Sequence, residues 1–347
     1  MAPEIRRSLL LHSRTRRDPH AVLRRMLDRV PPGTAPTEPV AELERRVAGL
    51  LGKPAALFFP SGTMAQQTAL RVHADRRHCR TFAAHPQTHL ALWEAQGPAT
   101  VHHLVHRPVG DPHELITLDE LRRVREPLSA LLLELPQREI GGLLPEWDDL
   151  VAQTAWARER GAAVHLDGAR LWESQPFYDR PVAEIAALAD TAYVSLYKGL
   201  EGVRGAVLAG PEDVVGEASV WRTRLGGNLP DAWPEAVAAL VGLDETLPRM
   251  AGFLDHARAI AAAINADGYA RTRPEVPQTP LFHVLLPVSR EVASAASRRL
   301  LEETGIELPT HLRATGVPDR CALELSIGVT ADDFTPAEVA ELVRRLR

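Results

Sequence analysis

Two lysines stand out in a chain that otherwise uses arginine for its positive charges. Lysine and arginine together number 40, yet only Lys53 and Lys198 are lysines. A guanidinium is effectively never deprotonated, so it cannot serve as a neutral amine nucleophile or form a Schiff base. Lys53 follows a predicted helix end, where a solvated cation is a sufficient interpretation. Lys198 follows the apolar run 192–197 and precedes glycines, which favours a side chain presented at a strand end, although a simple ion pair with a carboxylate is the alternative.

An acid and an arginine lie at the end of another predicted strand. In VHLDGARLW, Asp167 and Arg170 follow the strand that begins at Ala162. The carboxyl ends of strands are where α/β sheets build their sites, and the chain between Asp167 and Lys198 is long enough for one helical connection. The two side chains can therefore share a cleft. A buried ion pair between Asp167 and Arg170 is the competing interpretation.

A glycine-containing turn between a strand and a helix could bind an anion. In FFPSGTMAQQTAL, an apolar strand runs into Ser61, Gly62 and Thr63, and a helix follows. Glycine lets backbone N–H groups approach an anion, and a helix N-terminus adds favourable partial charge, so a phosphate would fit here. An ordinary helix cap by Ser61 is the alternative.

Histidines cluster between residues 78 and 113. In HPQTHLALWEAQG, His85 and His89 precede Trp93 and Glu94, and a histidine that begins a helix can act as a cap or as a base. The sequence does not favour a metal site, because neighbouring histidines on a strand point to opposite faces and no carboxylate is suitably spaced. The histidines that could contribute to such a metal site are His78, His102, His103, His106 and His113.

Taken in this order, SGTM, His89, HLDGAR and SLYKGL resemble the threonine aldolase and β-eliminating lyase family of pyridoxal-phosphate (PLP) enzymes, fold type I. The resemblance extends from about Val40 to Gly227. It implies that Lys198 binds the PLP aldehyde as a Schiff base and that Asp167 pairs with the pyridinium nitrogen. It implies further cofactor contacts by Ser61, Gly62, Thr63, His89, Arg170 and Ser195.

The implied reaction is Cα–Cβ cleavage of a β-hydroxy-α-amino acid to glycine and an aldehyde, or its reverse. His89 would stack on the PLP ring and relay the proton of the β-hydroxyl, so that Lys198 and His89 are the expected catalytic residues. β-Elimination or transaldolation on a non-standard amino acid is the alternative, and a PLP-binding relative without activity is a third hypothesis.

The sequence departs from the family on the substrate side. Where the family has an arginine for the substrate α-carboxylate, ALELSIG places Glu324, which would repel that anion or bind a cationic part of a larger substrate. A second family histidine is lost in LELPQREIGG, at residues 136–138. Arg138, Arg14 or Arg313 could supply a relocated carboxylate clamp, or Arg138 and Arg313 could be solvated surface charges. The resemblance implies that Arg170 lies near the ring oxygen and the substrate. Ser13 resembles an N-terminal serine that helps to hold the carboxylate.

Strand and helix patterns alternate along most of the chain, which predicts an α/β fold with a mostly parallel sheet followed by a small α+β domain. The predicted division is an extended, Arg- and Pro-rich N-terminal arm at 1–40, a large PLP-binding domain at 41–245 and a small domain at 246–347. The stretch from Pro230 to Gly268 is predicted to be wholly helical.

Composition indicates a globular protein that acts on small molecules. A net charge of -5 gives no basic surface for nucleic acid or an anionic membrane. Cys79 and Cys321 form no CxxC pair, and no apolar run suits a signal peptide or membrane span, so a soluble, cytoplasmic protein is expected. GGN at 226–228 resembles a family loop that reaches a neighbouring subunit, which implies a homodimer or homotetramer with active sites at the interface.

Overall fold

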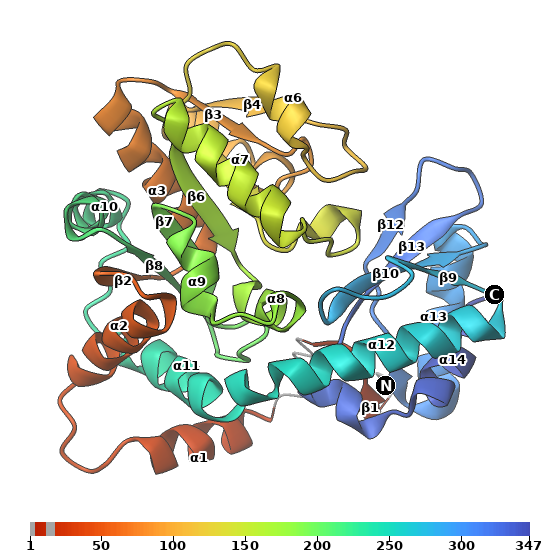
Figure 1. Cartoon of the computed structure of the whole chain (residues 1–347). Coiled ribbons are helices and arrows are strands. Elements are labelled where there is room, and N and C mark those ends of the chain that lie inside the picture. The colour runs from red at the N-terminus through yellow and green to blue at the C-terminus, as the bar shows by residue number, and fades with distance from the viewer. Residues whose placement is uncertain (1–3, 12–17) are drawn as a thin grey trace. The chain divides into compact units, whose positions relative to one another are not determined.

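The computed structural model describes residues 4–11 and 18–347 (Figure 1). The chain divides into two compact units. The larger unit comprises residues 25–139 and 144–247, and the smaller comprises residues 140–143 and 248–347 together with the described N-terminal residues 4–11 and 18–24. All the chemistry discussed for Lys198 and Asp167 belongs to the larger unit.

A seven-stranded sheet organises the larger unit, with strand order β2, β8, β7, β6, β5, β3, β4. Neighbouring strands from β7 to β4 are parallel, and only β8 runs antiparallel to its neighbours β7 and β2. The predicted mostly parallel α/β sheet is confirmed. The strands are β2 (Ala55–Phe59), β3 (Thr81–Ala84), β4 (Val105–Pro108), β5 (Ala130–Glu134), β6 (Ala163–Gly168), β7 (Thr191–Ser195) and β8 (Ala206–Gly210).

Helix α3 (Gly62–Arg77) covers the face of this sheet that bears the site. Leu70 and Ala74 of α3 pack with alternate residues of β3, β5 and β6, and Ala65 and Ala69 pack with Tyr193 of β7. Successive side chains of a strand point to opposite faces, so residues two apart share this face. Every second residue therefore lies on this face from Ala130 to Glu134 in β5, from Ala163 to Asp167 in β6 and from Thr191 to Ser195 in β7. Each series runs from the core under α3 toward the carboxyl end of its strand.

Other helices complete the larger unit. Helix α2 ends at Gly52, whose φ of 60° is the left-handed conformation that terminates a helix. Helix α10 packs on α3, and α7 packs along β5 and β6 (Figure 1). The helical segments are α2 (Glu38–Leu51), α4 (His89–Leu92), α5 (Gly97–Thr100), α6 (Leu118–Arg122), η1 (Arg138–Ile140), α7 (Trp147–Glu159), α8 (Leu171–Tyr178), α9 (Val182–Ala187), α10 (Glu212–Arg224) and α11 (Trp233–Glu245).

The smaller unit is built on a four-stranded antiparallel sheet in the order β12, β13, β10, β9. Its core joins Phe282, Leu323 and Leu325 of this sheet to apolar faces of its helices. Its elements are β1 (Arg7–Ser8), η2 (Leu247–Arg249), α12 (Met250–Asp267), β9 (Arg271–Arg273), β10 (Leu281–Leu286), α13 (Arg290–Thr304), β11 (Ile306–Glu307), β12 (Leu312–Ala314), β13 (Cys321–Ser326), η3 (Val329–Asp333) and α14 (Pro336–Arg344). In the described parts of the chain, no helix combines the length and the apolar character needed to cross a bilayer.

Three local expectations were wrong. Within the expected extended arm, residues 19–29 form helix α1 (Pro19–Arg29), because most residues of its sequence AVLRRMLDR are good helix formers. The helix expected after His89 stops at Leu92, since Ala95 and Gln96 have φ of 48° and 60°. The strand expected around His102 begins only at Val105, so the adjacent histidines do not lie on opposite faces of a strand.

Candidate active site

Two carboxylates lie side by side at the carboxyl ends of adjacent strands. Glu134 of β5 pairs in register with Asp167 of β6, and both point to the face covered by α3. Asp167 is 1% exposed, and its Oδ1 accepts a hydrogen bond of 3.1 Å from the backbone N–H of Ala169. Its other oxygen, Oδ2, is buried without a hydrogen-bond partner among the residues that the structure describes. A buried carboxylate oxygen without a hydrogen-bond partner is a strong acceptor for a donor on a bound molecule.

Lys198 follows the next strand in the sheet, β7, and lies on a turn. The backbone N–H of Glu201 donates to the Lys198 carbonyl over 3.1 Å, and that of Gly202 donates to Leu196 over 2.9 Å. Gly202 fits closely, since a Cβ there would lie 2.4 Å from the Leu196 carbonyl oxygen. This turn holds Lys198 at the carboxyl ends of the strands, where Asp167 lies near the end of β6.

The structure brings the main predicted residues together around one pocket. Lys198, Asp167, His89, Arg170 and Arg138 all line it, and the empty space within it measures about 260 Å³. Glu134, Leu135, Pro136 and Ala169 complete its wall. The expectation that Asp167 and Lys198 share a cleft is therefore confirmed.

The protonation equilibria of this cluster are strongly biased by burial. Desolvation lowers the pKa of the Lys198 amine, and the cation of Arg170 lowers it further, while Asp167 acts in the opposite direction. Desolvation raises the pKa of Asp167, which the nearby Lys198 ammonium partly offsets. For Glu134, desolvation together with the charge of Asp167 raises the pKa to about 7. Such shifts favour an amine that can become neutral and one carboxyl that holds a proton near neutral pH.

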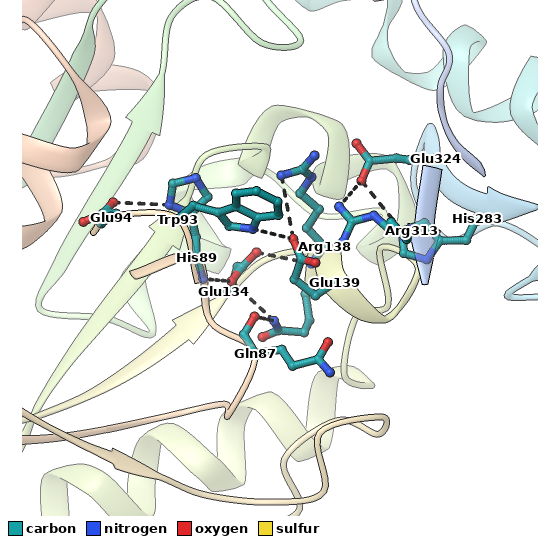
Figure 2. A network of polar contacts seen from close by, with 11 residues as sticks. Gln87, His89, Trp93, Glu94, Glu134, Arg138, Glu139, His283, Arg313 and Glu324 are labelled. Atoms are coloured by element: carbon teal, nitrogen blue, oxygen red, sulfur yellow. Dashed lines mark hydrogen bonds and ion pairs between the residues drawn. The ribbon is translucent and has the colours of Figure 1, made fainter. Parts of the chain in front are cut away.

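His89 begins α4 and is held at two points (Figure 2). Its ring Nδ1 lies 3.2 Å from Glu94 Oε1, and its backbone N–H donates to Glu134 Oε2 over 3.2 Å. The side chain of His89 remains 27% exposed, whereas that of Glu94 is fully buried. His89 thus presents a fixed imidazole to the pocket.

The turn at Ser61 and the end of β7 lie on either side of β8. Phe59 and Ser195 are both paired with Ala206 of β8, so the residues that follow β2 lie near Ser195. The Ser61 hydroxyl caps α3 by accepting from the N–H of Met64 over 3.2 Å, which confirms the capping interpretation for its side chain. A Cβ on Gly62 would lie 2.0 Å from the Tyr193 hydroxyl, so only glycine fits here.

Ser195 is buried, and its hydroxyl oxygen has no hydrogen-bond partner in the described chain. The N–H groups of Gly62 and Thr63 occupy the first turn of α3, where a helix offers no carbonyl partners of its own. Together with the Ser195 hydroxyl, these N–H groups are candidate donors to an anion, and we call this set the anion cradle.

The predicted arginines have different environments. Arg170 is buried and donates from Nη1 to both carboxylate oxygens of Glu173, each over 3.0 Å. Arg138 lies in η1, its guanidinium is 6.0 Å from the ring of Trp93, and Glu139 is 3.7 Å away. Because Arg138 is only 24% exposed and lines the pocket, its interpretation as a solvated surface charge is wrong.

The tentative substrate residue Ser13 and the neighbouring Arg14 lie outside the described residues, and Arg313 belongs to the smaller unit. Arg313 of β12 forms an ion pair of 2.7 Å with Glu324 of β13, and both side chains are only 11% exposed (Figure 2). His283 of β10 lies 3.7 Å from the same Glu324 oxygen. The surface-charge interpretation of Arg313 is therefore wrong, and Glu324 is neutralised within its own sheet.

Sequence reasoning grouped Glu94 with His89 but gave it no role, and it missed Glu134 as a member of the cluster. Glu94 lies five residues after His89, and Glu134 directly precedes the LPQR segment. An acid at the end of the apolar run ALLLE could have indicated Glu134, since the same argument identified Asp167 at the end of AVHLD. No pattern in the sequence indicates that Glu94 folds back onto the ring of His89.

PLP suits this arrangement on structural grounds. Its pyridine N–H is a donor for the unsatisfied Asp167 Oδ2, and its phosphate is an acceptor for Ser195 and for the N–H groups at Gly62 and Thr63. Lys198 supplies a neutralisable amine for its aldehyde. The residues present therefore fit the cofactor that the motifs imply.

Comparison with known proteins gives a consistent assignment. The sequence profile of the beta-eliminating lyase family matches residues 33–285. A low specificity L-threonine aldolase from Escherichia coli K12 is 29% identical over 242 residues, covering 68% of this chain and 71% of that protein. Low-specificity L-threonine aldolase 1 from Arabidopsis thaliana is 28% identical over 278 residues, covering 77% of each chain.

A solved structure from Listeria monocytogenes EGD-E, assigned as an L-allo-threonine aldolase, matches with a TM-score of 0.90 and 37% identity. The match covers 99% of this chain and 96% of that one. The predicted fold, that of type I PLP enzymes, is confirmed, and so is the prediction of PLP as the cofactor. From its sequence profile, its near full-length structural match and its pocket, the chain belongs to the beta-eliminating lyase family.

Proposed function

We propose that this protein is a PLP-dependent aldolase that cleaves the Cα–Cβ bond of a threonine-like β-hydroxy-α-amino acid, giving glycine and an aldehyde. The observation that carries the proposal is the convergence of Lys198, Asp167 and His89 on one pocket. The names of the relatives, which are threonine aldolases, point to the same reaction. When bound, PLP supplies an electron-accepting ring for the electron pair of the broken bond.

The residues have separable roles in this proposal. Lys198 attaches the cofactor through Nζ, and its lowered pKa keeps a neutral amine accessible for that attachment. Asp167 accepts from the pyridine N–H and so keeps the ring cationic. Gly62, Thr63 and Ser195 bind the phosphate, with Ser61 capping the helix that carries them. These contacts fix the ring so that the scissile bond of the substrate can be oriented.

His89 stacks on the ring and takes the proton of the substrate β-hydroxyl. A base within hydrogen-bond reach of that proton typically contributes about 10²-fold to 10⁴-fold. Its exposure of 27% leaves room for contact with bound molecules, while its two anchors fix the ring position. Lys198 and His89 are therefore proposed as the catalytic residues.

Arg138 is proposed as the main group that binds the substrate α-carboxylate, because its cationic side chain lines the pocket beside Lys198 and Asp167. Arg170 is proposed to lie near the ring oxygen and the substrate. Ser13 and Arg313 remain further proposed carboxylate ligands. A crystal soaked with glycine tests this set: if neither Arg138 nor Arg313 reaches the carboxylate, the relocated clamp is wrong.

The reaction itself is tested with purified protein, PLP and either L-threonine or L-allo-threonine. Stoichiometric acetaldehyde and glycine support the aldolase. Ammonia with a keto acid would instead indicate β-elimination, and exchange of the aldehyde part without net cleavage would indicate transaldolation. Covalent PLP retained after borohydride reduction, with no turnover of any substrate, would indicate a relative without activity.

The assembly and location are proposed separately. The loop 226–228 is proposed to contact a second copy of the chain in a homodimer or homotetramer with active sites at the interface, and mass measurement in solution tests it. Gly227 packs tightly on Met64 in the first turn of α3, which links this loop to the anion cradle. A cytoplasmic location is proposed because Cys79 and Cys321 are both unpaired, and cell fractionation checks it.

A further inference from the structure

Glu94 is a buried carboxylate that contacts two polar side chains of the same unit. Its Oε1 lies 3.2 Å from His89 Nδ1, and its Oε2 accepts from Gln67 Nε2 over 2.7 Å. Gln67 belongs to α3 and is itself buried, with the segment at Gly97 packed so closely that a Cβ there would lie 2.5 Å from Gln67 Nε2. Glu94 therefore has one fixed position, between α3 and the imidazole of His89.

The contact determines which nitrogen of His89 carries a proton. An ionised carboxylate can only accept hydrogen bonds, so in the neutral imidazole Nδ1 must be the donor and Nε2 the unprotonated, basic nitrogen. A ring held in this way is ready to receive a proton at Nε2. The carboxylate also stabilises the imidazolium that forms, as a buried acid does for the histidine of a serine hydrolase.

Other charged groups surround His89, but they do not contact its ring in the same way. Glu134 binds its backbone N–H rather than the imidazole. The remaining groups that face it across the pocket are Asp167 from β6, Lys198 after β7, Arg170 before α8 and Arg138 from η1. Of the carboxylates, Glu94 is the one whose oxygen lies against a ring nitrogen.

We propose that Glu94 is a positioning residue for the reaction: held by Gln67, it fixes His89 in the Nδ1–H tautomer and makes Nε2 the base for the substrate hydroxyl proton. This inference rests on the proposed aldol cleavage. It assigns to Glu94 a role in proton transfer in addition to packing.

The first test needs neither cofactor nor substrate. Protein labelled with ¹⁵N-histidine is examined by NMR in its PLP-free form, and the His89 signal is identified by its loss in His89→Asn. The expected pattern is a protonated Nδ1 and an unprotonated Nε2 in the neutral ring. A protonated Nε2 would overturn the inference, whatever reaction the protein performs.

The second test compares Glu94→Gln, Glu94→Asp and the matched control Glu126→Gln, which makes the same change in an exposed ion pair with Arg107. Glu94→Gln keeps the size of the side chain and removes its charge. Its kcat is expected to fall about 100-fold with PLP loading and KM nearly unchanged. The acid limb of its kcat profile should move to lower pH, because the anion that favours imidazolium is gone.

Glu94→Asp retains the charge at a greater distance, so it should recover part of the kcat and keep the wild-type pH profile. Glu126→Gln should behave as wild type. If Glu94→Gln loses activity only in proportion to lost PLP or lower thermal stability, with an unshifted pH profile, the role is structural and the inference is wrong. If wild-type protein cleaves no β-hydroxy-α-amino acid, the proposed function fails, while the NMR test still decides the tautomer.

Discussion

Strands β6 and β7 carry two polar clusters on the same face of the sheet. Near their amino ends, the Thr191 hydroxyl oxygen of β7 lies 2.8 Å from His165 Nδ1 of β6 and 2.8 Å from His73 Nε2 of α3. Two residues further along, Asp167 lies in the pocket that Lys198 also lines. Both clusters are buried and ionisable in principle, but only the second is open and contains groups of opposite charge.

The difference shows what separates a site from a core. One hydroxyl can donate to one histidine and accept from the other while both rings are neutral. The second nitrogen of each ring, His73 Nδ1 and His165 Nε2, is buried without a hydrogen-bond partner in the described chain. Burial lowers the pKa of His73 and of His165 to about 3, which keeps them neutral. In the pocket, Lys198 and Asp167 each shift the other's equilibrium toward its charged form. A catalytic site needs ionisable groups that are accessible and that shift one another's pKa.

The largest expected effect concerns the pocket cluster. Lys198→Arg keeps a cation at this position but removes the amine that can become neutral. We expect activity to fall by at least about 10⁴-fold. Borohydride reduction followed by mass spectrometry should find no pyridoxyl group at residue 198, and wild-type labelling at Lys53 instead would contradict the assignment.

Asp167→Asn should give the next largest effect. The amide keeps the shape of the side chain but loses the charge that holds a proton on the pyridine nitrogen. We expect kcat to fall on the order of 100-fold and PLP affinity to decrease, because one buried charged partner has been removed. The measurements are steady-state kinetics and PLP titration; a variant with unchanged kcat would place the ring nitrogen elsewhere.

Acidification should change the free energy of unfolding in opposite directions through the histidine cluster and through Glu134 in the pocket. Between pH 6.5 and about 3, the unfolded chain protonates His73 and His165 while the folded cluster does not, so each lowers the unfolding free energy by about 1 kcal/mol per pH unit of acidification. Glu134 acts in the opposite direction between pH 4.5 and about 7, because its folded pKa is raised. Urea unfolding across this range should show a steeper loss in Glu134→Gln than in wild type.

The smallest effect is expected for Ser195→Ala. Because the buried hydroxyl has no partner in the described chain, its removal should not destabilise the PLP-free protein. PLP affinity should fall about tenfold through loss of one phosphate hydrogen bond. Pyridoxal, which lacks the phosphate, should bind both proteins equally, and a loss of affinity for both ligands would contradict a phosphate role.

The sequence indicated those parts of the fold and site that depend on local pattern. AALFF, SALLLEL and AVHLD are apolar runs of strand length, so β2, β5 and β6 were predicted close to their observed bounds. Asp167 could be found because it lies near the end of such a strand, and Lys198 because it follows one within a few residues. The left-handed residues at Ala95 and Gln96 were not predictable, since neither type favours that conformation.

The contacts that depend on folding back were also not predictable. Glu94 reaches His89 only because the helix stops early, and Arg313 meets Glu324 only through the pairing of β12 with β13. Such partners are fixed by register, which a single sequence does not specify at that precision. The carboxylate at 324 therefore looked isolated when it is in fact paired.

The scarcity of lysine has a practical consequence. Lys53 is partly buried and donates to the Ala189 carbonyl, and Lys198 lines the pocket. With only these two lysines in the sequence, amine-reactive reagents meet almost no competing side chains. Reductive methylation with isotope-labelled formaldehyde would place two resolvable probes on the whole protein besides its N-terminus. One of them would report directly on occupancy of the pocket, with the other as an internal reference.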